Sequence, residues 1–188
     1  MTSEQAGIIW LAATPIGNVD DASTRLRDLL ETADCIAAED TRRLGSLCAR
    51  MGVTYTGELI PVHDHNESDR AAELVDRALA GQTVLLVSDA GTPTVSDPGF
   101  RVTRAAAAAG VRVSPVPGPS AALAALSVSG LPSDRFTFEG FLPRKSGEAR
   151  RRLEGVASLP HTLVFFESPR RLPGTLRLLG EVLGSSRP

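Results

Sequence analysis

The sequence predicts an α/β protein of two domains, the first of which contains a mainly parallel sheet. Short apolar, β-branched runs alternate with longer alanine- and leucine-rich amphipathic stretches, which is the pattern of βαβ units. The chain has 188 residues, of which 42% are hydrophobic and 22% charged, as is typical of globular proteins. That length fits one complete domain and part of another.

The first domain is expected over residues 1–116. Its strands are expected at 8–13, 35–38, 58–62, 84–87 and 111–116, and its helices near 22–32, 41–51, 67–80 and 98–109. The proline-rich stretch 115–119 marks the junction to the second domain, because proline stiffens a crossing and cannot extend a sheet internally.

The second α/β domain is expected over residues 117–188. Its helices are expected near 120–128, 147–158 and 170–183, and its strands at 135–139 and 162–166. A sheet usually needs three or more strands to be stable by itself, so we expect this domain to be truncated and to have an open sheet edge.

Composition excludes several classes of protein. The formal net charge of −2 argues against general attraction to nucleic acid, although a local basic face remains compatible with it. No segment approaches the roughly 18 apolar residues of a membrane span, and residues 1–7 do not resemble a signal peptide. Cys35 and Cys48 have neither metal-site spacing nor the density of a disulfide scaffold. We therefore expect a soluble, cytoplasmic protein with reduced thiols.

Glycines, prolines and small polar residues gather in three loops, at 14–18, 88–99 and 117–121. Each is expected directly after a strand, where α/β proteins approach their ligands. The first loop lacks the G-x-G-x-x-G of dinucleotide sites, and no segment has the spacing of a P-loop. By spacing alone each loop could be an ordinary turn. The 88–99 loop is longer and more constrained than a connection requires, which favours a functional role.

The motifs in and around these loops occur in an order that identifies a family. They are TPIGN at 14–18, AEDTR at 38–42, HDHNE at 63–67, VSDAGTPTVSDPGF at 87–100, VPGPSA at 116–121, SGLP at 129–132, FEGFLPRK at 138–145 and FFESPRRL at 165–172. In this set the chain closely resembles the ribosomal RNA small subunit methyltransferase I family, the ribose 2′-O-methyltransferase branch of the tetrapyrrole methylase superfamily.

The resemblance implies a two-domain tetrapyrrole-methylase-like fold, a homodimer, and S-adenosylmethionine bound in a cleft between the domains. The implied substrate is a cytidine ribose in the decoding region of 16S ribosomal RNA, as free RNA or within the 30S subunit. By position, the implied cofactor-binding residues are Pro15, Asp89, Ala90, Gly91, Thr92, Val95, Ser96, Ser120, Ala121 and Phe166. Two of these have plainer interpretations, since Ser120 could cap its helix and Asp89 could fix its own turn.

Methyl transfer to a hydroxyl needs aligned reactants and an acceptor for the hydroxyl proton. The candidate acceptors follow predicted strands and are Glu39, Asp40, His63, His65 and Glu167. We favour Glu39 and Asp40 as catalytic, because Arg42 beside them could bind a phosphate. The alternative is a helix start with acidic residues near its positive end. The two histidines of the 63–67 motif are weak evidence for a metal, and we expect none.

RNA contacts are expected from Arg42, His65, Asn66, Arg144 and Lys145, with further arginines at 43, 150–152 and 170–171. Taken singly, each basic group could be an ordinary solvated side chain, and residues 65–67 could instead cap the following helix. Two other functions stay open: methylation of a tetrapyrrole or another small molecule, and non-catalytic binding of cofactor or RNA.

Overall fold

The computed structural model describes residues 7–185 and 187, and the chain divides into two compact units, Met1–Ala121 and Ala122–Pro188. The division falls after Ala121, whereas the proline-rich stretch placed the junction after residue 116.

The first unit is built on a five-stranded sheet in the order β3-β2-β4-β1-β5, in which every pair is parallel. The strands are β1 (Ile8–Ala12), β2 (Cys35–Ala38), β3 (Glu58–Pro61), β4 (Thr83–Val87) and β5 (Arg112–Val116). The α/β class and the parallel first sheet are therefore confirmed.

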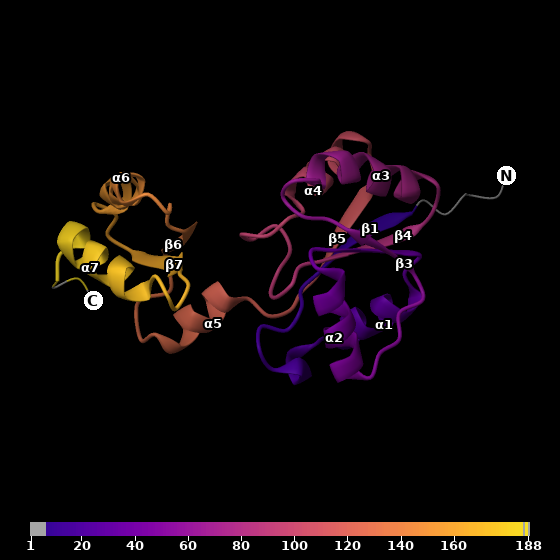
Figure 1. Cartoon of the computed structure of the whole chain (residues 1–188), viewed down its shortest axis with the longest axis horizontal. Helices are drawn as coiled ribbons and strands as arrows, with labels where there is room; N and C mark the ends of the chain where they lie inside the picture. The colour runs from indigo at the N-terminus through magenta and orange to yellow at the C-terminus, as the bar shows by residue number, and fades with distance from the viewer. Residues whose placement is uncertain (1–6, 186, 188) are drawn as a thin grey trace. The chain divides into compact units, whose positions relative to one another are not determined.

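Helices cover both faces of this sheet (Figure 1). They are the short 3₁₀ helix η1 (Val19–Asp21) and the α-helices α1 (Thr24–Thr32), α2 (Thr41–Met51), α3 (Glu67–Leu79) and α4 (Phe100–Ala108). Alternate residues of β2 divide between the two faces: Ile36 packs with α1 and α2, whereas Cys35 and Ala37 pack with α3 and α4. Burial on both faces explains why the inner strands β1, β2 and β4 are almost continuously apolar, whereas the edge strands β3 and β5 also carry polar residues.

Side-chain and glycine caps set the ends of the first two α-helices. The Ser23 hydroxyl accepts a hydrogen bond from Leu26 N at 3.1 Å, and α1 begins at the next residue. Helix α2 begins after the cap Asp40 and ends at Met51, where the cap Gly52 follows with a left-handed φ of 69°. These are common start and stop signals, which is why the sequence located both helices closely.

The order of the strands creates a switch point between β1 and β4. From β1 the chain passes through α1 toward β2 and β3, and from β4 it passes through α4 toward β5 on the other side. Helices α1 and α4 lie on opposite faces of the sheet (Figure 1). Neighbouring loops at such a point leave room for a ligand at the carboxyl ends of the strands.

The second unit contains the parallel pair β6 (Phe136–Phe141) and β7 (Thr162–Phe166), with α5 (Ala121–Val128), α6 (Ser146–Val156) and α7 (Leu172–Leu183). Leu142, Ala149 and Leu153 form its buried centre. Strand β6 continues past the expected end at residue 139, because the register shifts between Phe138 and Gly140 and Gly140 takes a φ of 63°. Across residues 7–185 no helix combines the length and apolarity needed to cross a membrane.

Candidate functional site

The loops that follow β1 and β4 are joined through their backbones. Thr14 N donates to Gly91 O at 2.9 Å, and Gly91 N donates to Thr14 O at 3.1 Å, forming an isolated antiparallel bridge. The fully buried Thr14 hydroxyl donates to Ser88 O at 3.1 Å. These bonds fix both loops at the switch point of the sheet.

The loop after β5 packs onto the same pair. Thr92 Oγ1 donates to Pro119 O at 3.2 Å. A Cβ atom at Gly118 would lie 3.0 Å from the Ala13 Cβ, so a larger residue here would force the two loops apart by a few tenths of an ångström. The three loops at 14–18, 88–99 and 117–121 therefore meet at one edge of the sheet.

The 88–99 loop adopts an unusual backbone. Gly91 and Gly99 have φ values of 91° and 130°, and Thr94 and Ser96 have values of 75° and 64°. A left-handed conformation is disfavoured for a β-branched residue such as threonine, and costs about 1–3 kcal/mol unless surrounding contacts impose it. Strain of this kind concentrates at functional sites, in agreement with a ligand-binding role for the loop.

The residues expected to bind cofactor differ in exposure. Pro15 and Gly91 are buried, Asp89, Thr92 and Ser120 are half-buried, and Ala90, Val95, Ser96 and Ala121 are exposed. Ile16, which the sequence did not single out, is an exposed apolar residue of the 14–18 loop, as Val95 is of the 88–99 loop, and 38% of the Ile16 surface is accessible. Phe166 belongs to β7 of the second unit, where its ring centroid lies 4.7 Å from that of Phe138 and 5.5 Å from that of Phe141.

Asp89 connects the loops after β2 and β4. Its Oδ1 accepts from Asp40 N at 3.1 Å, and its own N donates to Glu39 Oε2 at 3.4 Å. Arg43 Nη1 lies 3.0 Å from Asp89 Oδ2. The Asp89 carboxylate therefore fixes the neighbouring β2 loop, which is a wider role than stabilising its own turn.

The two carboxylates expected to be catalytic have different environments. Asp40 Oδ1 accepts from Arg42 N at 2.9 Å, at the start of α2, and Oδ2 accepts from Arg42 Nη2 at 2.9 Å. Hydrogen bonds from the Arg42 side chain and backbone hold the pKa of Asp40 at about 2. Burial and then the charge of Asp89 raise the pKa of the half-buried Glu39. Asp40 acts as a helix cap, and Glu39 is the stronger proton acceptor of the two.

Asp97 has a strongly shifted pKa that sequence reasoning missed. Burial, followed by the charges of Glu39, Asp89 and Asp64, raises the pKa of Asp97 to about 6, against the opposing effect of a hydrogen bond from Ser88. The available signal was an aspartate inside a constrained loop directly after a buried strand. The result is a locally negative region at the carboxyl ends of β2, β3 and β4, which favours a cation over a phosphate.

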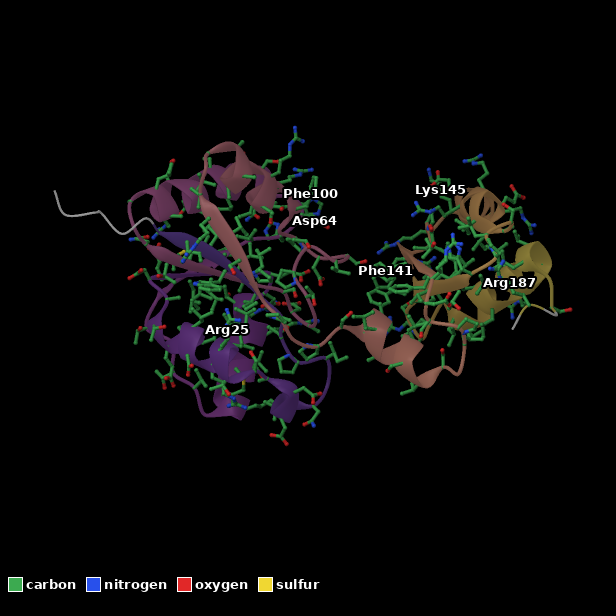
Figure 2. All side chains as sticks on the ribbon, turned by 180° about the vertical axis from the view of Figure 1, so that it is seen from behind. Arg25, Asp64, Phe100, Phe141, Lys145 and Arg187 are labelled. Carbon is green, nitrogen blue, oxygen red and sulfur yellow. The ribbon has the colours of Figure 1, made fainter. Side chains whose placement is uncertain are left out.

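The loop after β3 is held by its own asparagine. Asn66 Oδ1 accepts from His63 N at 2.8 Å, and Asn66 Nδ2 donates to Pro61 O at 3.0 Å. The Asn66 side chain thus shapes the loop and makes no cap hydrogen bond to α3. His63, Asp64 and His65 are exposed, and Asp64 is labelled in Figure 2. Among the described residues, no three His, Cys, Asp or Glu side chains form a group able to hold a metal ion.

The expected basic contacts of the second unit lie in the turn between β6 and α6. Arg144 and Lys145 are exposed, and Lys145 Nζ lies 3.3 Å from Glu148 Oε1. Phe141, at the end of β6, and Lys145 are both labelled in Figure 2. Solvent exposure makes both cations available to a phosphate, with Lys145 partly neutralised by its neighbour.

Glu167 is occupied by structural hydrogen bonds. Its carboxylate accepts from Ser168 N and from Thr175 Oγ1, each at 2.7 Å, and Arg171 Nη2 lies 3.5 Å from Oε2. Burial would raise the pKa of Glu167, but the hydrogen bonds from Thr175 and Ser168 and the charge of Arg171 outweigh it and lower that pKa. The carboxylate anchors the start of α7, which makes it a poor proton acceptor.

A parallel α/β sheet with three joined loops at its switch point defines an α/β ligand-binding protein. Comparison with known families identifies the family. The family model for tetrapyrrole (corrin/porphyrin) methylases matches residues 9–187, and the chain belongs to this family. Similar solved structures include the methyltransferase CobJ, with 24% identity and a TM-score of 0.68 over 93% of this chain and 76% of that one. Cobalt precorrin-4 methyltransferase has 17% identity and a TM-score of 0.64 over 96% and 77% of the two chains. These likenesses confirm the fold.

Closer in sequence are proteins named ribosomal RNA small subunit methyltransferase I. The chain is 51% identical to the one from Xylella fastidiosa over 96% of its length, 47% identical to the one from Escherichia coli O157:H7 over 96%, and 48% identical to the one from Mycobacterium tuberculosis over 97%. It spans 66%, 63% and 64% of the lengths of these curated relatives, respectively.

Proposed function

We propose that this chain methylates the ribose 2′-hydroxyl of a cytidine in the decoding region of 16S ribosomal RNA, using S-adenosylmethionine. The observation that carries the proposal is the 47–51% identity, across 96–97% of the chain, to three proteins named ribosomal RNA small subunit methyltransferase I. The resemblance to that family extends the proposal to a homodimer acting in the bacterial cytoplasm.

The loops of the first unit suit the chemistry of S-adenosylmethionine. Its adenosine is neutral and needs apolar walls and backbone hydrogen bonds, which Ile16, Val95 and the glycine at 91 can supply. Its sulfonium is a cation, which the carboxylates of Asp89 and Asp97 can attract. A pyrophosphate would be repelled by the same carboxylates. When bound, the cofactor supplies a methyl group on a positively charged leaving atom.

The chain's own residues then orient the reactants and accept a proton. Glu39 is the proposed proton acceptor for the ribose hydroxyl, because burial and Asp89 raise its pKa above that of an ordinary glutamate. Asp40 caps the start of α2 and pairs with the Arg42 guanidinium. The Arg42 side chain is 90% exposed and can reach a phosphate. Asp89 keeps the Glu39 loop beside the 88–99 loop through the two hydrogen bonds between them.

Calorimetry with S-adenosylmethionine, followed by a methylation assay on 30S particles and on free 16S RNA, tests this proposal. Glu39→Gln is expected to lower the turnover number by about 10²–10⁴-fold, the usual contribution of a general base, while cofactor affinity changes little. Glu31→Gln, on the exposed end of α1, is the matched control and should keep full turnover. Cofactor binding without methylation of either RNA substrate would reject the proposed substrate, and no cofactor binding would reject the proposal as a whole.

The double substitution Arg144→Ala and Lys145→Ala is expected to weaken RNA binding and flatten its salt dependence. Each phosphate contact contributes about 0.7–0.9 to the slope of log affinity against log salt, so the slope should fall by about 1–2. Filter binding of an RNA fragment at several salt concentrations measures it. Arg112→Ala, an exposed cation at the start of β5, should leave the slope unchanged. Equal slopes for parent and double variant would place both residues outside the RNA interface.

A further inference from the structure

The carboxylate of Glu67 is buried at the start of α3 without a cationic partner. Glu67 is 5% exposed, and within residues 7–185 and 187 no arginine, lysine or histidine forms a salt bridge with it. A buried carboxylate persists only where hydrogen bonds replace its lost hydration. Its partners therefore indicate what the residue does.

Those partners are backbone groups at the start of a different helix, α4. Glu67 Oε1 accepts from Gly99 N at 2.8 Å, from Arg101 N at 2.7 Å and from Val102 N at 3.4 Å. The helix's own cap residue is Gly99, which has no side chain to accept these bonds. The negative carboxylate also lies favourably near the positive end of the helix. Glu67 thus caps α4 from across the fold, 32 residues away from Gly99 in sequence.

A second contact joins the same two helix starts. The Arg101 guanidinium donates a hydrogen bond to the Ser68 hydroxyl, next to Glu67. The loop after β3 and the first turn of α4 are consequently held together by both backbone and side-chain donors. Because Asn66 fixes the β3 loop from the other side, Glu67 is attached to a rigid base.

The capped residue Gly99 is the last residue of the strained 88–99 loop. Its φ is 130°, and a Cβ atom there would lie 3.0 Å from Thr94 Cγ2 and 3.2 Å from Leu86 Cδ2. Thr94, itself left-handed, donates from its N to Pro98 O at 3.1 Å. At its beginning the loop is fixed by the Thr14–Gly91 bridge. Glu67 provides the corresponding attachment at its end.

We propose that Glu67 is a positioning residue that holds the 88–99 loop in its strained, ligand-ready conformation without touching the ligand. This inference rests on the proposed function for the identity of the ligand, S-adenosylmethionine. The hydrogen bonds that Glu67 Oε1 accepts all come from backbone amides at the start of α4, so the effect of Glu67 on the ligand passes through Gly99 and the loop. Loss of the carboxylate releases three amide donors and the end of the loop together.

Glu67→Gln and Glu67→Ala in the full 188-residue chain test this role. Glutamine keeps one carbonyl acceptor, so it should retain more function than alanine. Small displacements of binding groups have large effects, so we expect the dissociation constant and KM for S-adenosylmethionine to rise about tenfold or more in Glu67→Ala and to rise less in Glu67→Gln. The KM for RNA should stay unchanged and kcat should fall less than the cofactor affinity. A general loss of folded protein would instead lower all rates in proportion.

Hydrogen exchange measured without ligand tests the positioning role of Glu67 independently of the proposed function. The amides of residues 99, 101 and 102 should exchange faster in Glu67→Ala than in the parent, because alanine removes the acceptor of all three. Glu73→Ala, which removes another carboxylate of α3 that pairs with Arg70 and Arg77, is the matched control and should leave these amides protected. If the parent chain binds no S-adenosylmethionine but exchange is still faster in Glu67→Ala, the positioning role stands and only the ligand is rejected. Unchanged exchange and unchanged cofactor affinity in folded Glu67→Ala would overturn the proposal.

Discussion

Replacing Gly91 by valine is expected to reduce S-adenosylmethionine affinity by more than about 100-fold, because small misplacements at a binding site have effects of that size. Gly91 has a φ of 91°, and its backbone forms both hydrogen bonds of the bridge to Thr14. A β-branched residue is strongly disfavoured there. Its side chain would also start 3.6 Å from Ile16 Cγ2, at the surface proposed for the adenosine. Isothermal titration calorimetry measures the loss.

Gly110→Val is the matched control for backbone strain. Gly110 has a φ of 72° and open space around its Cβ position, and it precedes β5 at the opposite edge of the sheet. We expect a comparable loss of stability in this variant but parental cofactor affinity. If Gly91→Val does not fold, Gly91→Ala provides the same test with a smaller side chain. Parental affinity in a folded Gly91 variant would falsify the assignment of the loop to the cofactor.

Asp97→Asn is expected to stabilise the protein at neutral pH and to remove part of its pH dependence. The pKa of Asp97 rises from an ordinary 3.8 to about 6 in the folded chain, so the folded state binds more protons than the unfolded state between these values. Stability should therefore fall as pH rises from about 4 to 6 and then level off. Asp97 is partly exposed, so solvent screening reduces the effect of its charge. We therefore expect the free energy of unfolding of Asp97→Asn at pH 7 to exceed that of the parent by about 1–2 kcal/mol.

Urea unfolding of parent and Asp97→Asn between pH 5 and 8 measures this difference, and taking the difference removes the contributions of other groups. Glu39, whose pKa is also raised, changes stability in the same direction as Asp97, whereas the lowered pKa values of Asp40, Glu73 and Glu167 act in the opposite direction. A constant difference across this range would mean that the pKa of Asp97 is ordinary.

From the raised pKa of Asp97 we also expect cofactor affinity to depend on pH. Asp97, facing Glu39, Asp64, Asp89 and the Ser88 hydroxyl, loses its charge below about pH 6. S-adenosylmethionine should then bind less tightly at pH 5 than at pH 7, because its sulfonium is no longer attracted. S-adenosylhomocysteine has a neutral sulfur and should show a much smaller change. Equal pH dependence for both compounds would exclude an electrostatic role of this cluster.

The fold of the first unit was largely predictable from the sequence, because local signals determined it. The inner strands β1, β2 and β4 were apolar runs, and caps such as Ser23 and Asp40 marked helix starts. The three glycine- and proline-rich loops followed predicted strands, so parallel strand direction alone was enough to place them at one edge of the sheet. The bulge at Gly140, which lengthens β6, has no comparable local signal and was missed.

Only the tertiary structure shows how the environments of the candidate site residues differ. Asp40 and Glu39 are neighbours with the same charge, yet hydrogen bonds from Arg42 lower the pKa of one, and burial and Asp89 raise that of the other. Asn66, expected to contact RNA, and Glu167, a candidate proton acceptor, both make hydrogen bonds within their own units.

The sequence by itself determined the strands, the helices and the loops that carry the motifs. It did not determine the Thr14–Ser88 bond across 74 residues, the Asp40–Asp89 bond across 49, or the capping of α4 by Glu67. Hydrophobic periodicity and capping are local and can be read along a chain. Hydrogen bonding and pKa depend on burial and on neighbours from distant segments, which exist only once the sheet has brought its strand ends together.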